Sequence, residues 1–272
     1  MDNARRSGRE ERAIIVVIGL QTPIPTDGWS PLAVSIFERK QASPFVYAYA
    51  SVFQVRFEME MRAAIVRAAE ALSRSGLRFA DFPRARCNER YWQLTPFGGF
   101  KIRPDQTPAA GIRDIFENGY LYATECATAT AIAVYKGALD VLGDTQFNRV
   151  FRGLLLYNWH LDDDLRLTKD QGEAFPGDLL YFNNPDYNPE TPQWRGENVI
   201  LIADNLFYGH PVGIVPGEVI IEGLNRVRRP FSLVSAYLTD DVVRPDYKYL
   251  AQFAPGMRPK IFAWIGSRRE IV

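Results

Sequence analysis

Residues 124–143 read TECATATAIAVYKGALDVLG, and this stretch carries the strongest structural signal in the chain. Its apolar side chains recur at three- and four-residue steps, the period of a helix packed on a core. They are Ile132, Tyr135, Leu139 and Leu142. Gly143 is a helix stop signal. Cys126 lies in the first turn or two, where unpaired N–H groups and the positive dipole end favour a thiolate. Cys126 is therefore either a nucleophile or a buried cysteine acting as a small hydrophobe.

The composition is that of an ordinary globular protein. The chain has 272 residues, 47% of them hydrophobic, with 32 acidic and 32 basic side chains, so nothing directs it to nucleic acid or an anionic membrane. The two cysteines lie far apart, and Cys87 falls in a basic loop, 83–90, that we expect to be a solvated connection. Residues 1–12 are polar and charged and predict a disordered leader before a single domain spanning 13–272.

The apolar run at 13–20 follows basic residues, as a signal peptide would. It holds only eight residues and lacks a convincing cleavage site, so we interpret it as a buried β-strand. No transmembrane span is predicted.

Helical patterns dominate the first half of the chain and short β-type runs the second half. Residues 47–75, ending before Gly76, and residues 108–118 predict helices, and residues 96–99 predict a hairpin turn. The β-type runs are 153–160, 177–182, 198–203, 206–210, 218–221 and 233–238. Helices followed by antiparallel strands predict an α+β fold.

A nucleophilic thiol needs a base or charge partner, and two residues near one predicted turn are candidates. If residues 204–205 form a two-residue hairpin loop, Val199 pairs with His210 and Glu197 with Val212. Glu197 and His210 then point to one face within reach of each other. A helix-borne cysteine facing an acid and a histidine on adjacent antiparallel strands is the papain-like arrangement in outline, with His210 as the base. Alternatively, Glu197 is a solvated strand-end residue and His210 a turn residue.

Glu125 immediately precedes Cys126. Its carboxylate is either a partner of the helix dipole or, if buried beside the thiol, an alternative proton acceptor. Trp159, Tyr181 and Trp194 lie near these elements, either as core residues or as walls that exclude water and hold an alkyl chain. The chain has no P-loop, dinucleotide fingerprint or His/Cys metal spacing, so we predict neither a cofactor nor a metal site.

Seven segments resemble the spore-coat protein-glutamine γ-glutamyltransferases of endospore-forming bacteria. They match in order and spacing from about residue 13 into the 230s, whereas the leader and the tail beyond Tyr237 match poorly. The segments are MRAAIVRAA (61–69), IRDIFENG (112–119), ECATA (125–129), LYNWH (156–160), LLYFNNPDYNP (179–189), QWRGENVIL (193–201) and FYGHPVGI (207–214). QWRGENVIL is specific, although ECATA alone would not be.

The resemblance implies a small, calcium-independent transglutaminase with a papain-like core. It implies Cys126 as nucleophile and Glu197 as its principal partner, with Glu125 and His210 as auxiliary acid/base or orienting groups. This differs from the geometric argument, which made His210 the base. The resemblance also marks four aromatic residues as candidates to line a narrow passage to the thiol. They are Phe79, Trp159, Tyr181 and Trp194.

The implied reaction joins a glutamine and a lysine of protein substrates, which would be spore coat proteins, through a Cys126 thioester. The product is an isopeptide cross-link. The resemblance places synthesis in the mother-cell cytoplasm and deposition in the spore coat, and a monomer is assumed. Two rivals remain at this stage: a cysteine amidase or peptidase on the same scaffold, and a non-enzymatic coat scaffold protein.

Overall fold

A computed structural model describes residues 15–20, 22–158, 163–256, 262–265 and 268–271. The leader predicted at 1–12 and the candidate Trp159 lie outside these residues. The single domain expected over 13–272 stays a prediction.

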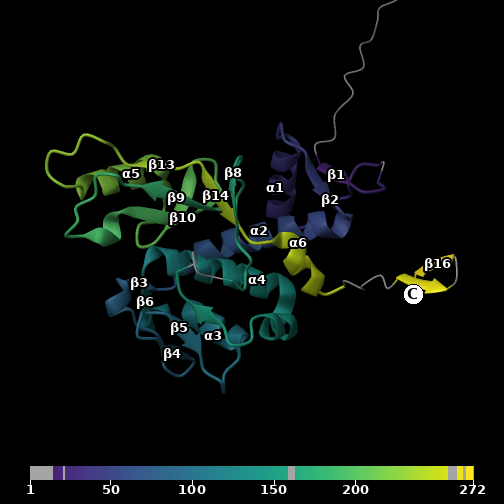
Figure 1. Cartoon of the computed structure of the whole chain (residues 1–272), viewed down its shortest axis with the longest axis horizontal. Coiled ribbons are helices and arrows are strands. Elements are labelled where there is room, and N and C mark those ends of the chain that lie inside the picture. The colour runs from purple at the N-terminus through teal and green to yellow at the C-terminus, as the bar shows by residue number, and fades with distance from the viewer. Residues whose placement is uncertain (1–14, 21, 159–162, 257–261, 266–267, 272) are drawn as a thin grey trace, which may run out of the picture.

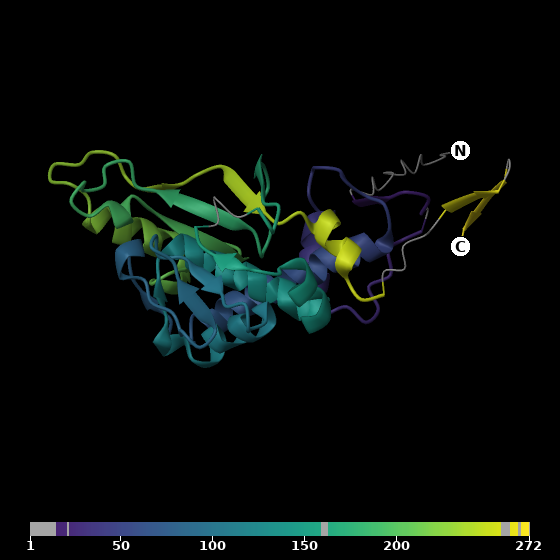
Figure 2. The same ribbon diagram turned by 60° about the horizontal axis from the view of Figure 1, so that its bottom comes forward.

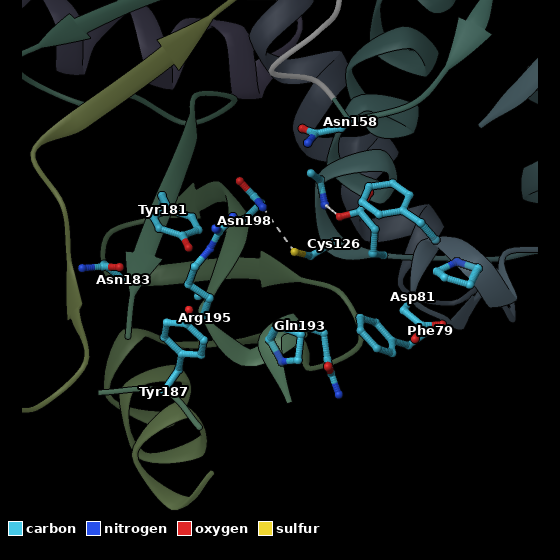
Figure 3. A pocket seen from close by; sticks show the side chains of 16 residues that line it. Phe79, Asp81, Cys126, Asn158, Tyr181, Asn183, Tyr187, Gln193, Arg195 and Asn198 are labelled. Carbon is cyan, nitrogen blue, oxygen red and sulfur yellow. Dashed lines mark hydrogen bonds between the residues drawn. The ribbon is translucent and has the colours of Figure 1, made fainter. Parts of the chain in front are cut away.

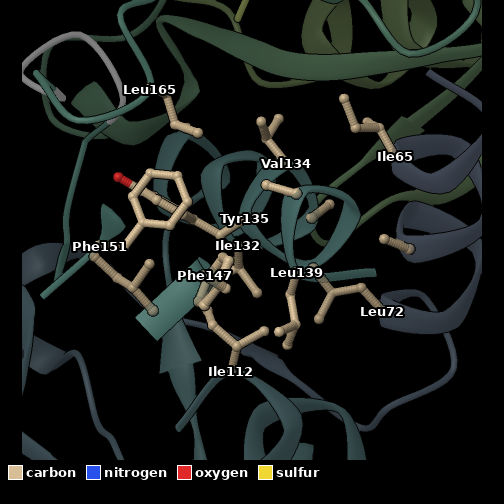
Figure 4. Close-up of a cluster of buried hydrophobic side chains, with 14 of the residues drawn as sticks. Ile65, Leu72, Ile112, Ile132, Val134, Tyr135, Leu139, Phe147, Phe151 and Leu165 are labelled. Carbon is tan, nitrogen blue, oxygen red and sulfur yellow. The ribbon is translucent and has the colours of Figure 1, made fainter. Parts of the chain in front are cut away.

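Helix α4 (Cys126–Val150) is the centre of the structure. It packs against α2 (Val52–Leu72), α3 (Pro108–Glu117) and β10 (Gly196–Ala203). From Cys126 to Leu139 all its side chains but one are buried, as expected for a helix enclosed by its own core. Figure 4 shows the α4 side chains meeting those of α2 and α3. Those labelled on the three helices are Ile65, Leu72, Ile112, Ile132, Val134, Tyr135, Leu139 and Phe147.

Gly143 interrupts α4 but does not end it. Its φ of 72° lies in the left-handed region that glycine tolerates, which breaks the helix as the sequence indicated. The chain resumes a helical path at once and continues to Val150. The second helical segment brings Phe151 to 5.1 Å from Tyr135, ring centre to ring centre. The stop predicted at Gly143 is therefore confirmed as a break, and a second helical segment follows it to Val150.

A large antiparallel sheet lies on one side of α4 (Figure 1). Its strand order is β12 (Gly213–Pro216), β11 (Leu206–Gly209), β10, β9 (Leu179–Asn183), β14 (Asp241–Arg244) and β8 (Thr168–Gln171), and β13 (Tyr237–Leu238) also pairs with β9. Ile200 and Ile202 of β10 join the core around α4, whereas Val199 and Leu201 join a second cluster with α5 (Gly217–Arg226). The predicted α+β class is confirmed.

Residues 218–221 form part of helix α5, and the prediction of a strand there was wrong. Ile220 and Leu224 are buried four residues apart, which is helical spacing. Gly217 starts the helix after Pro216, and Glu218 lies in the first turn, where a carboxylate suits the dipole.

The predicted helix at 47–75 divides into a strand and a helix. Tyr47–Tyr49 is β2, which pairs in parallel with β1 (Ile15–Val17), so the strand predicted at 13–20 is confirmed over its middle residues. The Ser51 side chain then caps α2 by accepting from the Gln54 N–H at 3.3 Å. Helix α2 ends at Leu72, before Gly76.

The remaining elements lie mainly across α4 from the large sheet, as Figure 2 shows. Strand β3 (Arg78–Phe79) pairs in parallel with β6 (Ala123–Thr124), and β4 (Trp92–Leu94), β5 (Phe100–Ile102) and β7 (Leu155–Leu156) form a small antiparallel sheet. The hairpin at 96–99 is thus confirmed, whereas β7 covers only part of the run predicted at 153–160. Elsewhere lie α1 (Pro31–Gln41), α6 (Tyr247–Leu250) and the hairpin of β15 (Phe262–Ile265) and β16 (Arg268–Ile271). No helix in the described ranges is long and apolar enough to cross a membrane.

Candidate active site

Cys126 is the first residue of α4 and lies in a pocket of about 710 Å³. Strand β6 lies just before Cys126 in the chain, and its parallel pairing with β3 fixes the start of α4. One wall of the pocket comes from residues 79–83 and the opposite wall from β9, β10 and residues 187–195 (Figure 3). Only 8% of Cys126 is exposed, so the thiol is reached through this pocket rather than from open solvent.

Glu125 is the N-cap of α4 and lines the same pocket. Its carboxylate accepts hydrogen bonds from the N–H groups of Ala127 at 2.6 Å and Thr128 at 2.7 Å. The carboxylate thus lies at the positive end of the helix, as expected for a partner of the helix dipole, and it caps the helix next to the thiol.

The surroundings of Cys126 favour the protonated form of its thiol. Burial, Glu197 and then Glu125 raise its pKa well above the ordinary value, and hydrogen bonds from Asn198 only partly oppose them. The expectation that the helix N-terminus would favour a thiolate was wrong. The positive end of the helix is occupied by the Glu125 carboxylate, and loss of water disfavours a second negative charge. A nucleophilic Cys126 thus needs a base at the moment of reaction.

Glu197 is the buried acid of the site. It lies near the start of β10 with 2% of its surface exposed, and its Oε1 accepts a hydrogen bond of 2.7 Å from the backbone N–H of His210. Burial raises the pKa of Glu197 well above its usual range, the His210 bond opposes this, and the charge of Glu125 adds to it. A carboxylate with a raised pKa is a stronger base, which suits proton exchange with a thiol.

The hairpin of β10 and β11 has a different register from the predicted one. Ala203 faces Leu206 as expected, but a bulge between Leu201 and Ala203 places Val199 opposite Gly209 instead of His210. Glu197 accepts a hydrogen bond from the backbone N–H of His210, and the register predicted for this hairpin was wrong.

Gly209 leaves the space that Glu197 uses. A Cβ on residue 209 would lie 3.0 Å from Oε1 of Glu197 and 2.7 Å from a methyl group of Val212. Glycine at this position thus lets the carboxylate approach the chain end of β11.

The imidazole of His210 is buried beside the aromatic wall. Burial lowers the pKa of His210, although the carbonyl groups of Arg78 and Thr124 oppose that shift, so the ring is neutral at neutral pH. It lies tilted against Phe79, with ring centres 6.1 Å apart. His210 thus orients Glu197 through its backbone and packs through its ring.

Three of the four predicted aromatic residues gather at the pocket. Phe79 and Tyr181 line it, and Trp194 stacks on Phe79 at 5.6 Å with ring planes 12° apart. Tyr181 lies directly over Gly196, where a Cβ would overlap its hydroxyl. The pocket therefore has flat apolar surfaces on the approach to the thiol.

Sequence reasoning missed Asn198. Its Nδ2 donates to Sγ of Cys126 at 3.2 Å, from a side chain that is buried. Alternation along β10 could have placed it, because residues two apart share one face of a strand. Asn198 therefore faces α4 together with Ile200 and Ile202. Six other polar residues in the pocket wall were not singled out either, although all but Asp81 lie in segments that carry the family resemblance. They are Asp81, Asn158, Asn183, Tyr187, Gln193 and Arg195.

Cys87 lies outside this site. The loop 83–90 is mostly exposed, as expected, but Cys87 itself is buried. Arg86 forms a β-bridge with Ala123, which holds the loop against the core. Burial and then Glu89 raise the pKa of Cys87 to about 12, so this thiol is unreactive at neutral pH.

Comparisons with known proteins give a consistent result. A family model described as protein-glutamine gamma-glutamyltransferase matches residues 16–254. Proteins of that name from Bacillus mycoides (strain KBAB4) and Bacillus cereus (strain B4264) are each 41% identical over 252 residues, covering 90% of this chain and 91% of the relative. A solved transglutaminase from Geobacillus stearothermophilus, without its C-terminal extension, superposes with a TM-score of 0.72 at 48% identity, covering 74% of this chain and 97% of that one. The resemblance indicated by the sequence motifs is confirmed.

Proposed function

The chain belongs to the protein-glutamine gamma-glutamyltransferase family, and from that premise and the site geometry we propose that Cys126 carries the acyl group during transfer. The enzyme is an acyltransferase. The observation that carries the proposal is the thiol of Cys126, which is buried at the start of a helix and lies inside a pocket, beside Glu197 and Glu125. Its pKa is raised by burial and then by these two carboxylates.

In the first half-reaction, Sγ of Cys126 attacks the carboxamide carbon of a protein-bound glutamine. Glu197 takes the thiol proton as the C–S bond forms. The same proton is returned to the nitrogen as the C–N bond breaks, so ammonia leaves and a thioester remains. The raised pKa values of Cys126 and Glu197 support this exchange, because a buried thiol and a buried carboxyl group can share one proton.

The three polar candidates have different roles in this proposal. Glu197 is the principal proton acceptor and donor. Glu125 caps α4 and adds negative charge beside the thiol, which makes it an auxiliary group. His210 holds Glu197 through its backbone N–H and is a positioning residue.

In the second half-reaction, a lysine ε-amine of a protein substrate attacks the thioester and an isopeptide bond forms. Glu197 takes one proton from the attacking neutral amine and returns it to Sγ as the C–S bond breaks, which regenerates the thiol. The stacked Phe79–Trp194 pair and Tyr181 support an apolar approach that admits an alkyl chain and limits water. Transfer to an amine would then prevail over hydrolysis.

We also propose a papain-like core, calcium-independent activity and a role in cross-linking spore coat proteins. Support for the core is the nucleophile helix packed on antiparallel strands that carry Glu197 and lead into His210. Support for the coat substrates and for synthesis in the mother cell is the resemblance of the sequence motifs to the spore-coat enzymes.

The thioester gives the direct test of this proposal. The enzyme is mixed with a glutamine-containing peptide in chelator, quenched in acid and analysed by intact mass spectrometry. We expect an adduct equal to the peptide minus ammonia, located on Cys126 and discharged by a primary amine. If the adduct is lost by hydrolysis at the same rate with and without the amine, the amidase is favoured. If no adduct forms on Cys126, the proposal is overturned.

A further inference from the structure

Attack on the glutamine carboxamide places negative charge on the former carbonyl oxygen, and this oxyanion needs N–H donors. The first free N–H groups of a nucleophile helix are the usual place to look for them. In this chain the N–H groups of Ala127 and Thr128 already donate to the Glu125 carboxylate at 2.6 and 2.7 Å. Two donors at the start of α4 are thus committed before substrate arrives.

Another donor points at the reacting sulfur from the opposite side of the pocket. Nδ2 of Asn198 lies 3.2 Å from Sγ of Cys126 and donates a hydrogen bond to it. Figure 3 shows the amide reaching from β10 across to the thiol. Asn198 is 7% exposed, and the fixed strand β10 supports it, so the amide is already oriented.

We propose that the side-chain amide of Asn198 is a donor to the oxyanion of the tetrahedral intermediate, which makes it a catalytic residue. The inference rests on the proposed function of Cys126. When the C–S bond forms, sulfur and the charged oxygen are attached to the same carbon, so an N–H directed at the sulfur needs only a small shift to reach the oxygen. As the carbonyl re-forms and ammonia leaves, the amide returns to the sulfur.

An amide suits this position for an electrostatic reason. Glu125 and Glu197 already flank the thiol, so a third carboxylate would repel the oxyanion, and a lysine or arginine would pair with the glutamates instead. A neutral, buried N–H donor stabilises the charge without neutralising the base.

Two reactions of Cys126 separate this role from simple activation of the thiol. Acylation by a glutamine peptide, followed as single-turnover ammonia release, forms an oxyanion. Alkylation by iodoacetamide is a displacement at a saturated carbon and forms none. We would compare the full chain with Asn198→Leu, which keeps the volume but removes the donor, and with Asn198→Ala. The matched control is Asn225→Ala, which removes an amide from α5 on the other face of the sheet.

We expect acylation to fall by about 10²–10³-fold in both Asn198 variants, with little change in KM for the peptide and a much smaller change in alkylation. Acylation within a few-fold of the unmodified enzyme would overturn the proposal. Equal losses of acylation and alkylation would also overturn it, because Asn198 would then act only on the thiol.

Circular dichroism would show whether each variant folds. If Asn198→Ala does not fold, Asn198→Leu alone tests the proposal. A failure of the proposed function itself is distinguishable, since the unmodified enzyme would then release no ammonia.

Discussion

The backbone N–H of His210 donates a 2.7 Å hydrogen bond to Oε1 of Glu197, and this bond fixes the buried acid of the site. The bond exists because β11 ends at Gly209, which leaves the next N–H outside the strand ladder. It opposes the effect of burial on the pKa of Glu197, so the bond favours the charged carboxylate in an enclosed site. His210 thus positions the Glu197 carboxylate through its backbone N–H.

Replacing Glu197 with glutamine should change two rates in opposite directions. Amine transfer should fall by about 10²–10⁴-fold, because the proton acceptor is lost. Alkylation of Cys126 by iodoacetamide at pH 8 should become faster, because the nearby charge that raises the thiol pKa is gone. Amine incorporation and alkylation would be measured on the same preparation. If alkylation slows in parallel with transfer, Glu197 does not act by the proposed electrostatics.

Replacing Glu125 with glutamine should have a milder effect. The amide oxygen can still accept one of the two capping hydrogen bonds, so transfer should fall less than in Glu197→Gln. Thermal denaturation should show a loss of about 1 kcal/mol, which is typical of a weakened helix cap. A larger loss of transfer than in Glu197→Gln would reverse the assignment of the two glutamates.

A methyl group at residue 209 should disturb catalysis more than stability. In Gly209→Ala the new Cβ would crowd Oε1 of Glu197 and the Val212 side chain, so the carboxylate has to move. We expect at least a tenfold lower kcat, consistent with a displaced proton acceptor, and a peptide KM within a few-fold of the original. Gly223→Ala, where a Cβ would meet open space, is the control. Unchanged kcat in Gly209→Ala would show that the position of Glu197 is not critical.

The structure also predicts that the free energy of unfolding decreases at acidic pH, because of a carboxylate that lies away from the site. Glu58 accepts hydrogen bonds from Lys40 at 2.6 Å, Arg62 at 2.9 Å and the Tyr49 hydroxyl at 2.8 Å. Burial alone would raise its pKa, but the charges of Lys40 and Arg62 lower the pKa of Glu58 from 4.5 to about 2. This contribution is therefore complete above pH 4.5 and is lost as pH falls towards 2.

A lowering of this size corresponds to a contribution on the order of 3 kcal/mol. Urea unfolding at pH 5 and pH 3 should show a smaller decrease in unfolding free energy for Glu58→Gln than for the unmodified chain. Glu70→Gln, at a half-buried position of the same helix, is the control. Equal decreases in both chains would show that Glu58 does not cause the acid sensitivity.

The sequence predicted the parts of the site that depend on local pattern. The apolar period of residues 124–143 located the helix that begins at Cys126, and the position of Glu125 before it indicated a partner of the helix dipole. The Asp204-Asn205 turn correctly paired Ala203 with Leu206.

The rest depended on tertiary packing. Residues 199–203 are apolar on both faces, so their pattern did not mark the bulge that shifts Val199 onto Gly209. The short run 218–221 carries no periodicity that separates a strand from a helix, and burial of Ile220 and Leu224 decides it. The raised pKa of Cys126 depends on burial together with two carboxylates, one of them 71 residues away in the chain, so a helix start alone gave the wrong sign.

The central claim is that Cys126 transfers glutamine acyl groups to amines. Its most direct test is incorporation of a fluorescent primary amine into casein, in chelator, by the unmodified chain and by Cys126→Ala, with Cys87→Ala as the matched control. The account predicts incorporation by the unmodified chain and by Cys87→Ala, and none by Cys126→Ala. Incorporation that survives in Cys126→Ala, or that is absent from the unmodified chain while ammonia is still released, would contradict it.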